Sequence, residues 1–270
     1  MRVKDIILIS DMDGTIIPIS GVISQKNIDA INKFRNLGGT FTIATGRSPG
    51  TGGTYFEQLG VDGLIIANNG ATIYDVKNDR TLWCKYLDKE YKEIVKHVKE
   101  KYPNVGIELI TDDGKYYIAS ENNTTKGWVR GSNFTYATVD ESQYPDNCCK
   151  VLFVAEPSDF KAFVTYMHEQ KFNDVVMVES GGSCFEMMCA GISKGYPFER
   201  LVTLYDKKME HTAAIGDYYN DVEMIEKAHI GAAVDNAVVE VKAKANIIVK
   251  SCEDDGLADF IEYLIKQSDI

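Results

Sequence analysis

The sequence predicts an α/β protein: a Rossmann-like, doubly wound parallel-sheet core into which an α+β domain is inserted. Short apolar runs without alternation, such as Ile6 to Ile9, suit strands that are buried on both faces of a parallel sheet. These runs alternate with helical patterns near both ends of the chain, and the alternation stops in the middle. We therefore expect a discontinuous core over residues 1–80 and 190–270 and an inserted domain over residues 81–189.

The N-terminal part repeats the order strand, helix, strand. Ser24 is suited to cap a helix whose apolar positions, from Ile28 to Leu37, recur at helical spacing until a Gly-Gly pair ends it. Further strands are expected at Thr40 to Ala44 and at Leu64 to Ala67. The stretch Gly50 to Gly53 lacks the Gly-Lys-Ser/Thr ending of a phosphate-binding P-loop, so we interpret it as a flexible loop.

The middle of the chain has a different pattern. Val105 to Ile110 and Lys115 to Ser120 flank an Asp-Asp-Gly sequence, which predicts a β-hairpin. Amphipathic helices are expected near Tyr91 to Tyr102 and Ser158 to Gln170. The polar stretch Glu121 to Gln143 is expected to be loop-rich. Together these patterns indicate a separate α+β unit.

The alternating pattern returns after Gly191. Strands are expected near Thr212 to Ile215, Ile230 to Val234 and Asn246 to Val249, with helical stretches between them. A domain inserted between the two halves of one sheet would form a lid beside the strand ends, and domain interfaces favour ligand sites.

Composition limits the class of protein and its partners. The chain has 270 residues, of which 44% are hydrophobic and 26% charged, as in ordinary globular proteins. The net charge of −11 argues against nucleic acid or an acidic membrane surface as a partner. Because no apolar run has the length of a signal-peptide core or a membrane span, we expect a cytoplasmic protein. The six cysteines form no Cys-x-x-Cys pair, so we expect reduced structural thiols, and no histidine motif supports a catalytic cysteine.

Two aspartates, Asp11 and Asp13, follow the first predicted strand directly. Open α/β sheets place ligands at the carboxyl ends of their strands, and two carboxylates so close repel unless a cation or a proton intervenes. We therefore predict a divalent metal site. The simplest alternative is an ordinary turn, which Asp and Gly often form. A calcium EF-hand is excluded, because Gly14 is fourth and Val22 twelfth where that motif needs Gly sixth and Glu twelfth.

A later predicted strand ends in the sequence Gly-Asp-Tyr-Tyr-Asn-Asp. Its Asp217 and Asp221 raise the number of carboxylates at the predicted edge to four. Mg²⁺ prefers oxygen ligands and commonly uses one or two carboxylates, water and a substrate phosphate. The alternative for either aspartate is an N-cap of the helix that contains Val222.

Five motifs, in combination and in order, resemble those of the haloacid dehalogenase-like (HAD) hydrolases, specifically the Cof-type phosphatases with a large C2-type cap. The resemblance spans nearly the whole chain and implies a cap inserted between the two core halves. The motifs are DMDGT at Asp11 to Thr15, ATGR at Ala44 to Arg47, ISKG at Ile192 to Gly195, GDYYND at Gly216 to Asp221 and DDG at Asp254 to Gly256.

The resemblance implies catalytic roles for four residues. Asp11 would be the nucleophile and Asp13 the general acid/base, while Thr45 and Lys194 would hold the transferring phosphoryl group. The chemistry of the side chains agrees with this, because a carboxylate that attacks phosphorus divides a difficult displacement into two easier ones. Lys194 supplies a compact positive charge and Thr45 a hydroxyl donor. Taken singly, a lysine such as Lys194 is more often a surface residue and a threonine such as Thr45 an ordinary strand-end hydroxyl; the assignment rests on the motifs in combination.

The resemblance also implies a set of metal ligands for Mg²⁺. Asp217 would bind the ion beside Asp11, Asp13 would contribute its backbone carbonyl, and Asp221 would support the site from nearby, either by binding the metal directly or through its neighbours.

The predicted substrate contacts are Met12, Gly46, Arg47 and Asn220. For Asn220 the alternative is that it orients Lys194, and for Arg47 that it is a surface or structural arginine. Tyr218 stands where relatives often carry a smaller residue, so we expect it to narrow the pocket.

The leading interpretation is a Mg²⁺-dependent phosphatase that hydrolyses a small phosphomonoester, such as a sugar phosphate, through an aspartyl-phosphate. Its expected partner is a small phosphorylated metabolite. One alternative is a phosphomutase or phosphotransferase acting on sugar phosphates, because the same core serves several reactions. Another is a non-catalytic sensor that binds a phosphometabolite. The sequence leaves the substrate and the oligomeric state open.

Overall fold

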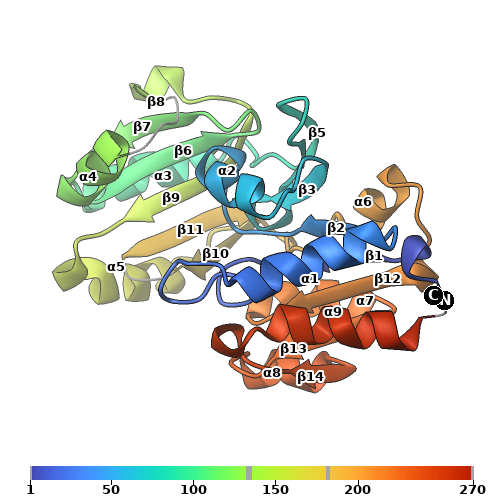
Figure 1. Cartoon of the computed structure of the whole chain (residues 1–270). Helices are drawn as coiled ribbons and strands as arrows, with labels where there is room; N and C mark the ends of the chain where they lie inside the picture. Colours follow the sequence, from blue (N-terminus) through green and yellow to red (C-terminus); the bar gives the residue numbers. More distant parts are fainter. Residues whose placement is uncertain (1, 132–135, 181–182, 269–270) are drawn as a thin grey trace. The chain divides into compact units, whose positions relative to one another are not determined.

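The computed structural model describes residues 2–131, 136–180 and 183–268 (Figure 1). The chain divides into two compact units. The first, the core unit, consists of Met1–Arg47, Gly52–Leu82 and Ser193–Ile270, and the second, the cap unit, consists of Ser48–Thr51 and Trp83–Ile192. Each unit encloses its own cluster of buried apolar side chains.

The core unit is built on a five-stranded sheet in the order β14-β13-β12-β1-β2, and its strand pairs are all parallel. The strands occupy the predicted places, and the burial of every β1 residue explains its continuous apolar run. Segments from opposite ends of the chain are neighbours, because β1 pairs with β12. The strands are β1 (Ile7–Ser10), β2 (Thr40–Ile43), β12 (Thr212–Gly216), β13 (Ile230–Val234) and β14 (Ile247–Val249).

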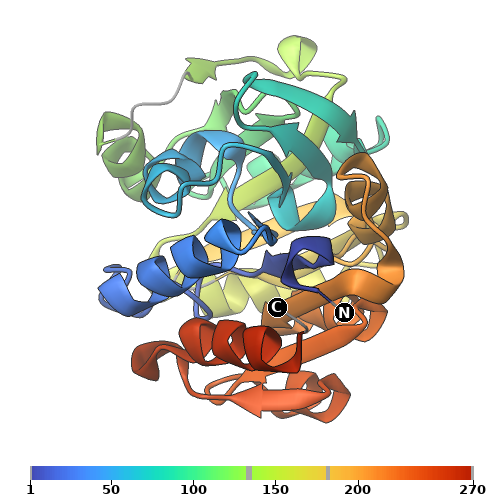
Figure 2. The ribbon, with the colours of Figure 1, turned by 45° about the vertical axis from the view of Figure 1, so that its right-hand side comes forward.

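Helices pack on this sheet. The helices α1 (Gln25–Asn36) and α9 (Gly256–Gln267) lie side by side (Figures 1 and 2). The predicted cap of α1 is confirmed, since Ser24 Oγ accepts a hydrogen bond of 3.1 Å from the backbone N–H of Asn27. The helix α7 (Val222–Lys227) packs against β12 and β13, and α8 (Val239–Lys244) packs against β13 and α7. A further helix, α6, spans Phe198–Leu204.

Two expectations for the N-terminal half need correction. The segment Leu64–Ala67 forms β3 as expected, but β3 belongs to a separate three-stranded sheet with β4 (Thr72–Asp75) and β5 (Arg80–Cys84). A single parallel bridge links the two sheets: it pairs Ala44, the residue after β2, with Ile66 of β3. The expected flexible loop at residues 50–53 is wrong, because these residues belong to the helix α2 (Pro49–Gln58). Proline suits the first turn of a helix, which outweighs the cost of the glycines here.

The cap unit contains a six-stranded sheet in the order β10-β11-β9-β6-β7-β8, antiparallel except for the β7–β8 pair. Helices α3 (Tyr91–Lys101) and α5 (Pro157–Glu169) occupy the predicted places and bury an apolar stripe against its core cluster. The predicted hairpin is confirmed as β6 and β7. The strands are β6 (Gly106–Thr111), β7 (Tyr116–Ser120), β8 (Tyr136–Thr138), β9 (Cys148–Val154), β10 (Val175–Glu179) and β11 (Cys184–Cys189).

The stretch 121–143 is more regular than expected. It contains the helix α4 (Asn123–Gly131), the short strand β8 and a 3-10 turn at Glu141–Gln143, while residues 132–135 lie outside the described part. Two of its polar residues form a reciprocal pair of hydrogen bonds at the start of the helix. Asn122 Oδ1 accepts from the N–H of Thr125 at 2.9 Å, and the N–H of Asn122 donates to Thr125 Oγ1 at 2.9 Å.

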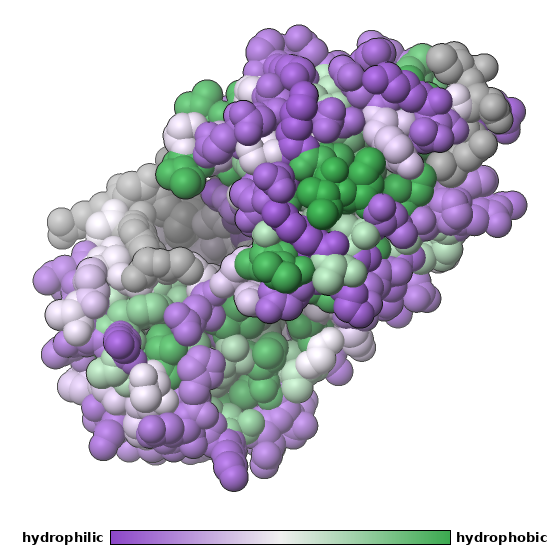
Figure 3. Space-filling view, turned by 90° about the horizontal axis from the view of Figure 1, so that it is seen from below, coloured by the Kyte–Doolittle hydropathy of each residue, from purple (hydrophilic) through white to green (hydrophobic). Residues whose placement is uncertain are grey.

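Hydrophilic residues cover most of the face shown in Figure 3, with smaller apolar groups between them. Among the described residues, no helix combines the length and the hydrophobicity that crossing a bilayer requires.

Candidate functional site

The candidate site lies at the carboxyl edge of the core sheet. Ser10, the last residue of β1, is in register with Ile215 in β12, and the N–H of Asp11 donates to the carbonyl of Ile215 at 2.9 Å. The residues that follow these two parallel strands therefore emerge at one edge. This brings Asp11 and Asp217 together, although more than 200 positions separate them in the sequence.

A buried lysine joins two of the predicted carboxylates. Lys194 Nζ donates to Asp11 Oδ1 and to Asp221 Oδ1, the latter at 2.7 Å. The three side chains are at most 4% exposed, so Lys194 is not a surface lysine. An ion pair so completely removed from water needs further hydrogen bonds to offset the loss of hydration.

Asp221 receives those further hydrogen bonds from the backbone. Its Oδ2 accepts from the N–H groups of Asp217 and Tyr218, at 3.0 and 3.1 Å. A Cβ on Gly216 would lie 2.5 Å from Asp221 Cγ, so the turn needs glycine at that position. Both oxygens of Asp221 are thus engaged within the protein. Both N–H groups that donate to Asp221 belong to residues before it in the chain. The Asp221 side chain therefore does not cap the N-terminus of α7.

The residues present fit a divalent cation. Oxygens of Asp11, Asp217 and Asp221 lie within 4.8 Å of one another. Asp11 Oδ2 is buried and accepts no hydrogen bond from the described part of the chain, which is unusual for a carboxylate. Thr15 Oγ1 donates to Asp217 Oδ1 at 3.2 Å, and Gly14, with φ of +83°, leaves room for the other oxygen of Asp217. Oxygen donors of this kind suit Mg²⁺.

The electrostatics of the cluster support the same conclusion. Burial raises the pKa of Asp11 well above its usual value, Lys194 opposes this, and Asp221 and Asp217 add to it. Burial also raises the pKa of Asp217, with Asp221 as the next cause. Burial lowers the pKa of Lys194, but the two carboxylates more than reverse this, so it is raised overall. A cation between Asp11 and Asp217 would stabilise the ionised forms of both.

A second group of polar residues follows β2 and β3. Thr45 is fully buried, and its carbonyl accepts from the N–H of Asn69 at 3.0 Å. Asn220 Nδ2 donates to Asn69 Oδ1 at 2.8 Å, and the carbonyl of Asn220 accepts from the N–H of Lys194 at 3.3 Å. A Cβ on Gly46 would lie 2.7 Å from Asn69 Oδ1. Asn69 therefore joins two of the predicted site segments, residues 44–47 and 216–221.

Sequence reasoning did not assign Asn69 to the site, although a signal was present. Asn68, Asn69 and Gly70 have φ values of +51°, +55° and +100°. Consecutive left-handed residues that are not glycine are strained, and strain of this kind is concentrated at functional sites. The Asn-Asn-Gly sequence directly after a buried strand was the available sign.

Asp13 and Arg47 lie apart from the carboxylate cluster. Arg47 Nε donates to Asp13 Oδ2 at 2.9 Å and Arg47 Nη2 to Asp13 Oδ1 at 2.6 Å. The Asp13 side chain is 51% exposed. Its side chain is thus not one of the clustered carboxylates, and the predicted metal contact through its backbone carbonyl stays a prediction. Met12 places its side chain in the hydrophobic core, so any contact of Met12 with substrate would come from its backbone.

Two further residues that the sequence did not reveal support the site loops. Asn236 Nδ2 donates to the carbonyl of Gly14 at 2.8 Å, and Asn236 Oδ1 accepts from the N–H of Cys252 at 2.7 Å. Glu223 accepts a hydrogen bond from Ser193 Oγ and forms an ion pair with Lys227 Nζ at 2.9 Å. Ser193 directly precedes Lys194. No sequence motif distinguishes these residues from ordinary surface residues.

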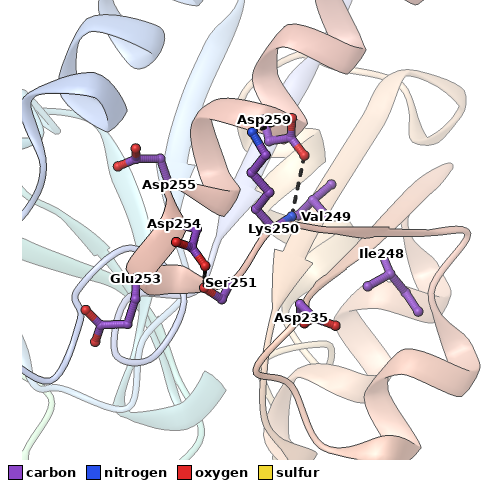
Figure 4. A pocket seen from close by; sticks show the side chains of 9 residues that line it. All are labelled: Asp235, Ile248, Val249, Lys250, Ser251, Glu253, Asp254, Asp255 and Asp259. Atoms are coloured by element: carbon purple, nitrogen blue, oxygen red, sulfur yellow. Dashed lines mark hydrogen bonds and ion pairs between the residues drawn. The ribbon is translucent and has the colours of Figure 1, made fainter.

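The DDG motif has a structural explanation. Asp255 has a φ of +64°, and the N–H of Gly256 donates to the carbonyl of Ser251 at 2.9 Å, which starts α9. The motif borders a hollow of about 740 Å³ lined largely by acidic side chains (Figure 4). Several of these are already paired: Ser251 Oγ donates to Asp254 Oδ2 at 2.6 Å, and Lys242 Nζ donates to Asp235 Oδ1 at 3.0 Å.

The six cysteines are free thiols, as expected. Burial raises the pKa of Cys184 to about 11 and that of Cys252 to about 12. These two side chains are therefore protonated at neutral pH, which does not suit a nucleophile.

Comparisons with known proteins agree with this geometry. A family profile of haloacid dehalogenase-like hydrolases matches residues 8–261. The chain is 26% identical over 269 residues to the 5-amino-6-(5-phospho-D-ribitylamino)uracil phosphatase YitU of Bacillus subtilis, covering 97% of this chain and 98% of that protein. It is 26% identical over 260 residues to an HMP-PP phosphatase of Yersinia pseudotuberculosis, covering 94% and 93%.

Solved structures show the same fold. A haloacid dehalogenase-like hydrolase from Bacteroides thetaiotaomicron superposes with a TM-score of 0.81 at 20% sequence identity, covering 96% of this chain and 99% of that one. The parallel core sheet with its helices and the antiparallel sheet of the cap unit are thus shared architecture.

Proposed function

Because the chain belongs to the haloacid dehalogenase-like hydrolases, as a phosphoric monoester hydrolase of the Cof type, we propose that it is a Mg²⁺-dependent phosphatase that forms an aspartyl-phosphate on Asp11. Its substrate is a small phosphorylated metabolite, such as a sugar phosphate. The inserted domain expected over residues 81–189 selects the substrate, and the core expected over residues 1–80 and 190–270 carries the chemistry.

One observation supports the proposal above all others. A buried carboxylate oxygen, Asp11 Oδ2, accepts no hydrogen bond from the described residues, while Lys194 holds the other oxygen. A buried carboxylate oxygen without a hydrogen bond destabilises the folded protein unless a ligand binds to it. It lies at the strand edge where α/β proteins bind ligands. A cation and a phosphoryl group are the ligands that its acidic and basic neighbours suit.

In the first step, Asp11 attacks the phosphorus atom of the substrate. The new bond joins a carboxylate oxygen to phosphorus, and the bond from phosphorus to the leaving oxygen breaks. Asp13 gives its proton to that oxygen, which leaves as an alcohol. Lys194 and the Thr45 hydroxyl hold the phosphoryl oxygens as charge redistributes over them. When bound, Mg²⁺ supplies positive charge that reduces the repulsion between the phosphoryl oxygens and the carboxylates.

In the second step, water attacks the phosphorus atom of the aspartyl-phosphate. Asp13, now a carboxylate, accepts the proton of that water, and the Asp11 carboxylate leaves as inorganic phosphate forms. The enzyme returns to its starting state. Asn220 keeps the loop of Lys194 in place through its carbonyl, and Asn69 fixes the amide of Asn220.

The residues that would hold the metal come from the same cluster. Asp11 and Asp217 would bind the ion through side-chain oxygens, and Asp13 would contribute its backbone carbonyl. For Asp221, whose two oxygens accept hydrogen bonds from Lys194 and from two backbone N–H groups, the proposed role is to support the site from nearby. Among the predicted substrate contacts, Met12 and Gly46 would act through their backbone N–H groups.

The test is phosphate release from a panel of sugar phosphates, nucleotides and cofactor phosphates, with and without Mg²⁺. We expect Mg²⁺-dependent release that is lost in Asp11→Asn. Transfer of labelled phosphate to a sugar acceptor instead of water would indicate a phosphomutase or phosphotransferase. Binding of phosphate esters without turnover across the whole panel would indicate a sensor and contradict the proposal.

A further inference from the structure

We propose that Arg47, held over the ring of Tyr55, is a positioning residue that orients the Asp13 carboxyl group for proton transfer, and that it does not bind the phosphoryl group. This inference rests on the proposed function, because it concerns the residue that protonates the leaving oxygen. It assigns a role to Tyr55 as well, a residue that no sequence motif marks.

The guanidinium of Arg47 contacts both oxygens of Asp13. The two hydrogen bonds, from Nε at 2.9 Å and from Nη2 at 2.6 Å, fix the plane of the carboxyl group as well as its position. The hydrogen bond with Asp13 raises the pKa of Arg47, so the guanidinium is charged at every relevant pH. The two nitrogens that face Asp13 are thus already committed to orienting it.

Arg47 is itself held from several sides. Its Cζ lies 4.7 Å from the centroid of the Tyr55 ring, within cation–π range. The N–H of Arg47 donates to Thr45 Oγ1 at 3.1 Å, and its carbonyl accepts from the N–H of Asn68 at 3.0 Å. The Tyr55 hydroxyl donates to the carbonyl of Gly21 at 3.3 Å, which fixes the ring. This support makes Arg47 a rigid reference point for Asp13.

Stability does not explain the arrangement. The Arg47 and Asp13 side chains are 30% and 51% exposed. Exposed ion pairs contribute about 0 to 1 kcal/mol to stability. An exposed aspartate without such a partner would occupy several rotamers, and a misplaced catalytic group can reduce the rate by about a hundredfold. The two contacts from Arg47 therefore serve to orient the Asp13 carboxyl group.

The proton transfer fits this geometry. One Asp13 oxygen leaves Arg47, takes up a proton from solvent water, and donates that proton to the leaving oxygen as the bond to phosphorus breaks. The other oxygen stays bound to Arg47, so the carboxyl group keeps its place. In the second step the first oxygen accepts the proton of the attacking water, releases it to the solvent and returns to Arg47.

The test compares two substrates that differ in their need for a proton. The 4-nitrophenolate ion leaves readily, whereas the phenolate of phenyl phosphate, with a conjugate-acid pKa of about 10, needs protonation more. We expect Arg47→Met to reduce kcat/KM for phenyl phosphate about tenfold more than for 4-nitrophenyl phosphate. Inhibition by inorganic phosphate should not change. Asp13→Asn should also lose more kcat/KM with phenyl phosphate than with 4-nitrophenyl phosphate. Adding Arg47→Met to Asp13→Asn should not change kcat/KM for either substrate further.

Two variants make the test specific. Arg47→Lys keeps the charge but not the two-pronged contact, so it should retain the defect with phenyl phosphate. Arg35→Met is the matched control, because the Arg35 guanidinium also lies over an aromatic ring, Phe41 at 5.3 Å, and donates to the carbonyl of Leu59. For Arg35→Met, the ratio of kcat/KM for phenyl phosphate to kcat/KM for 4-nitrophenyl phosphate should equal that of the wild type.

The outcomes separate this inference from the proposed function. An inactive wild type would contradict the proposed phosphatase and the role of Arg47 with it. An active wild type with an equal loss on both substrates in Arg47→Met, together with weaker inhibition by phosphate, would show that Arg47 binds the phosphoryl group. Restoration of the wild-type ratio by Arg47→Lys, or full additivity with Asp13→Asn, would also overturn the positioning role.

Discussion

The two units each bury a lysine against carboxylates, but they use it differently. In the core unit, Lys194 pairs with Asp11 and Asp221 after the ends of parallel strands. In the cap unit, Lys150 pairs with Glu186 at 2.9 Å in the middle of antiparallel strands, with side chains 5% and 9% exposed. Glu108 in β6 is close enough for its pKa to be affected by Lys150.

The difference shows that burial of charge alone does not mark a catalytic site. At Lys150 the charges belong to neighbouring strands of one sheet, so the fold itself sets their spacing. At Lys194 the partners follow strands whose ends leave backbone groups and an acidic oxygen, Asp11 Oδ2, available to a ligand. The proposed chemistry requires that available oxygen. Changes at the two lysines and their partners should therefore have different consequences, activity at one and stability at the other.

The largest expected effect is on turnover in Asp11→Asn. Removing the nucleophile should reduce kcat for 4-nitrophenyl phosphate by more than about a thousandfold. Circular dichroism should report an unchanged fold, because asparagine has nearly the same shape. Near-normal turnover in this variant would remove Asp11 from the mechanism and make the two lysine clusters equivalent.

The next largest effect is expected in Lys194→Met, which should lower both turnover and stability. The change leaves Asp11 and Asp221 buried without their shared positive charge, which should lower the free energy of unfolding by about 3 to 5 kcal/mol in the absence of metal. Urea unfolding would measure this. Added Mg²⁺ should restore part of the stability but not the turnover, since a cation can replace the charge and not the contact with phosphate. Equal stability with and without Mg²⁺ would contradict the proposed ligands.

A smaller effect is expected in the cap unit, from Glu186→Gln. This variant weakens the pair with Lys150 but leaves Glu108 nearby, so we expect a loss of about 2 kcal/mol in urea unfolding. Glu179→Gln is the matched control, because Glu179 is exposed on the neighbouring strand β10 and should cost less than about 0.5 kcal/mol. A loss in Glu186→Gln as large as that in Lys194→Met would remove the distinction between the two clusters.

The last effect is a pH dependence of stability that belongs to the cap unit, and it is similar in size to the loss expected in Glu186→Gln. Burial raises the pKa of Glu108 from 4.5 to about 7, and Lys150 only partly opposes this. The folded state therefore binds a proton more tightly than the unfolded state. The stability that this gives is present below pH 4.5 and is lost as the pH rises to about 7, by up to about 3 kcal/mol. Urea unfolding at pH 5 and pH 7.5 should show a smaller decrease in Glu108→Gln than in the wild type.

The sequence predicted the elements whose signals are local. The buried strands β1 and β12 have continuous apolar runs, and α1 has both a helical period and a Ser24 cap. The strand β3 was located correctly, but its partner was not, because pairing depends on contacts that local patterns do not encode. The helix α2 was missed because its glycines resemble a loop, and α4 because capping residues resemble loop residues.

The site shows the same division. Strand ends of a parallel sheet share an edge, so four carboxylates were expected there. Oxygens of Asp11, Asp217 and Asp221 do lie within 4.8 Å of one another, but the Asp13 side chain is not among them. The motifs gave no indication that Asp13 would face Arg47, or that Asn69 would join Thr45 to Asn220. Those contacts arise from side-chain directions after the turns, which the spacing of residues along the chain does not determine.

The most direct test of the central claim is to identify the phosphorylated residue. The enzyme would be mixed with 4-nitrophenyl phosphate and Mg²⁺, quenched in acid during turnover and treated with borohydride, which reduces an aspartyl-phosphate to homoserine. Peptide mass spectrometry should then find homoserine at position 11, and it should be absent without Mg²⁺ and in Asp11→Asn. Release of phosphate with an unmodified position 11, or with modification at another residue, would contradict the proposed role of Asp11.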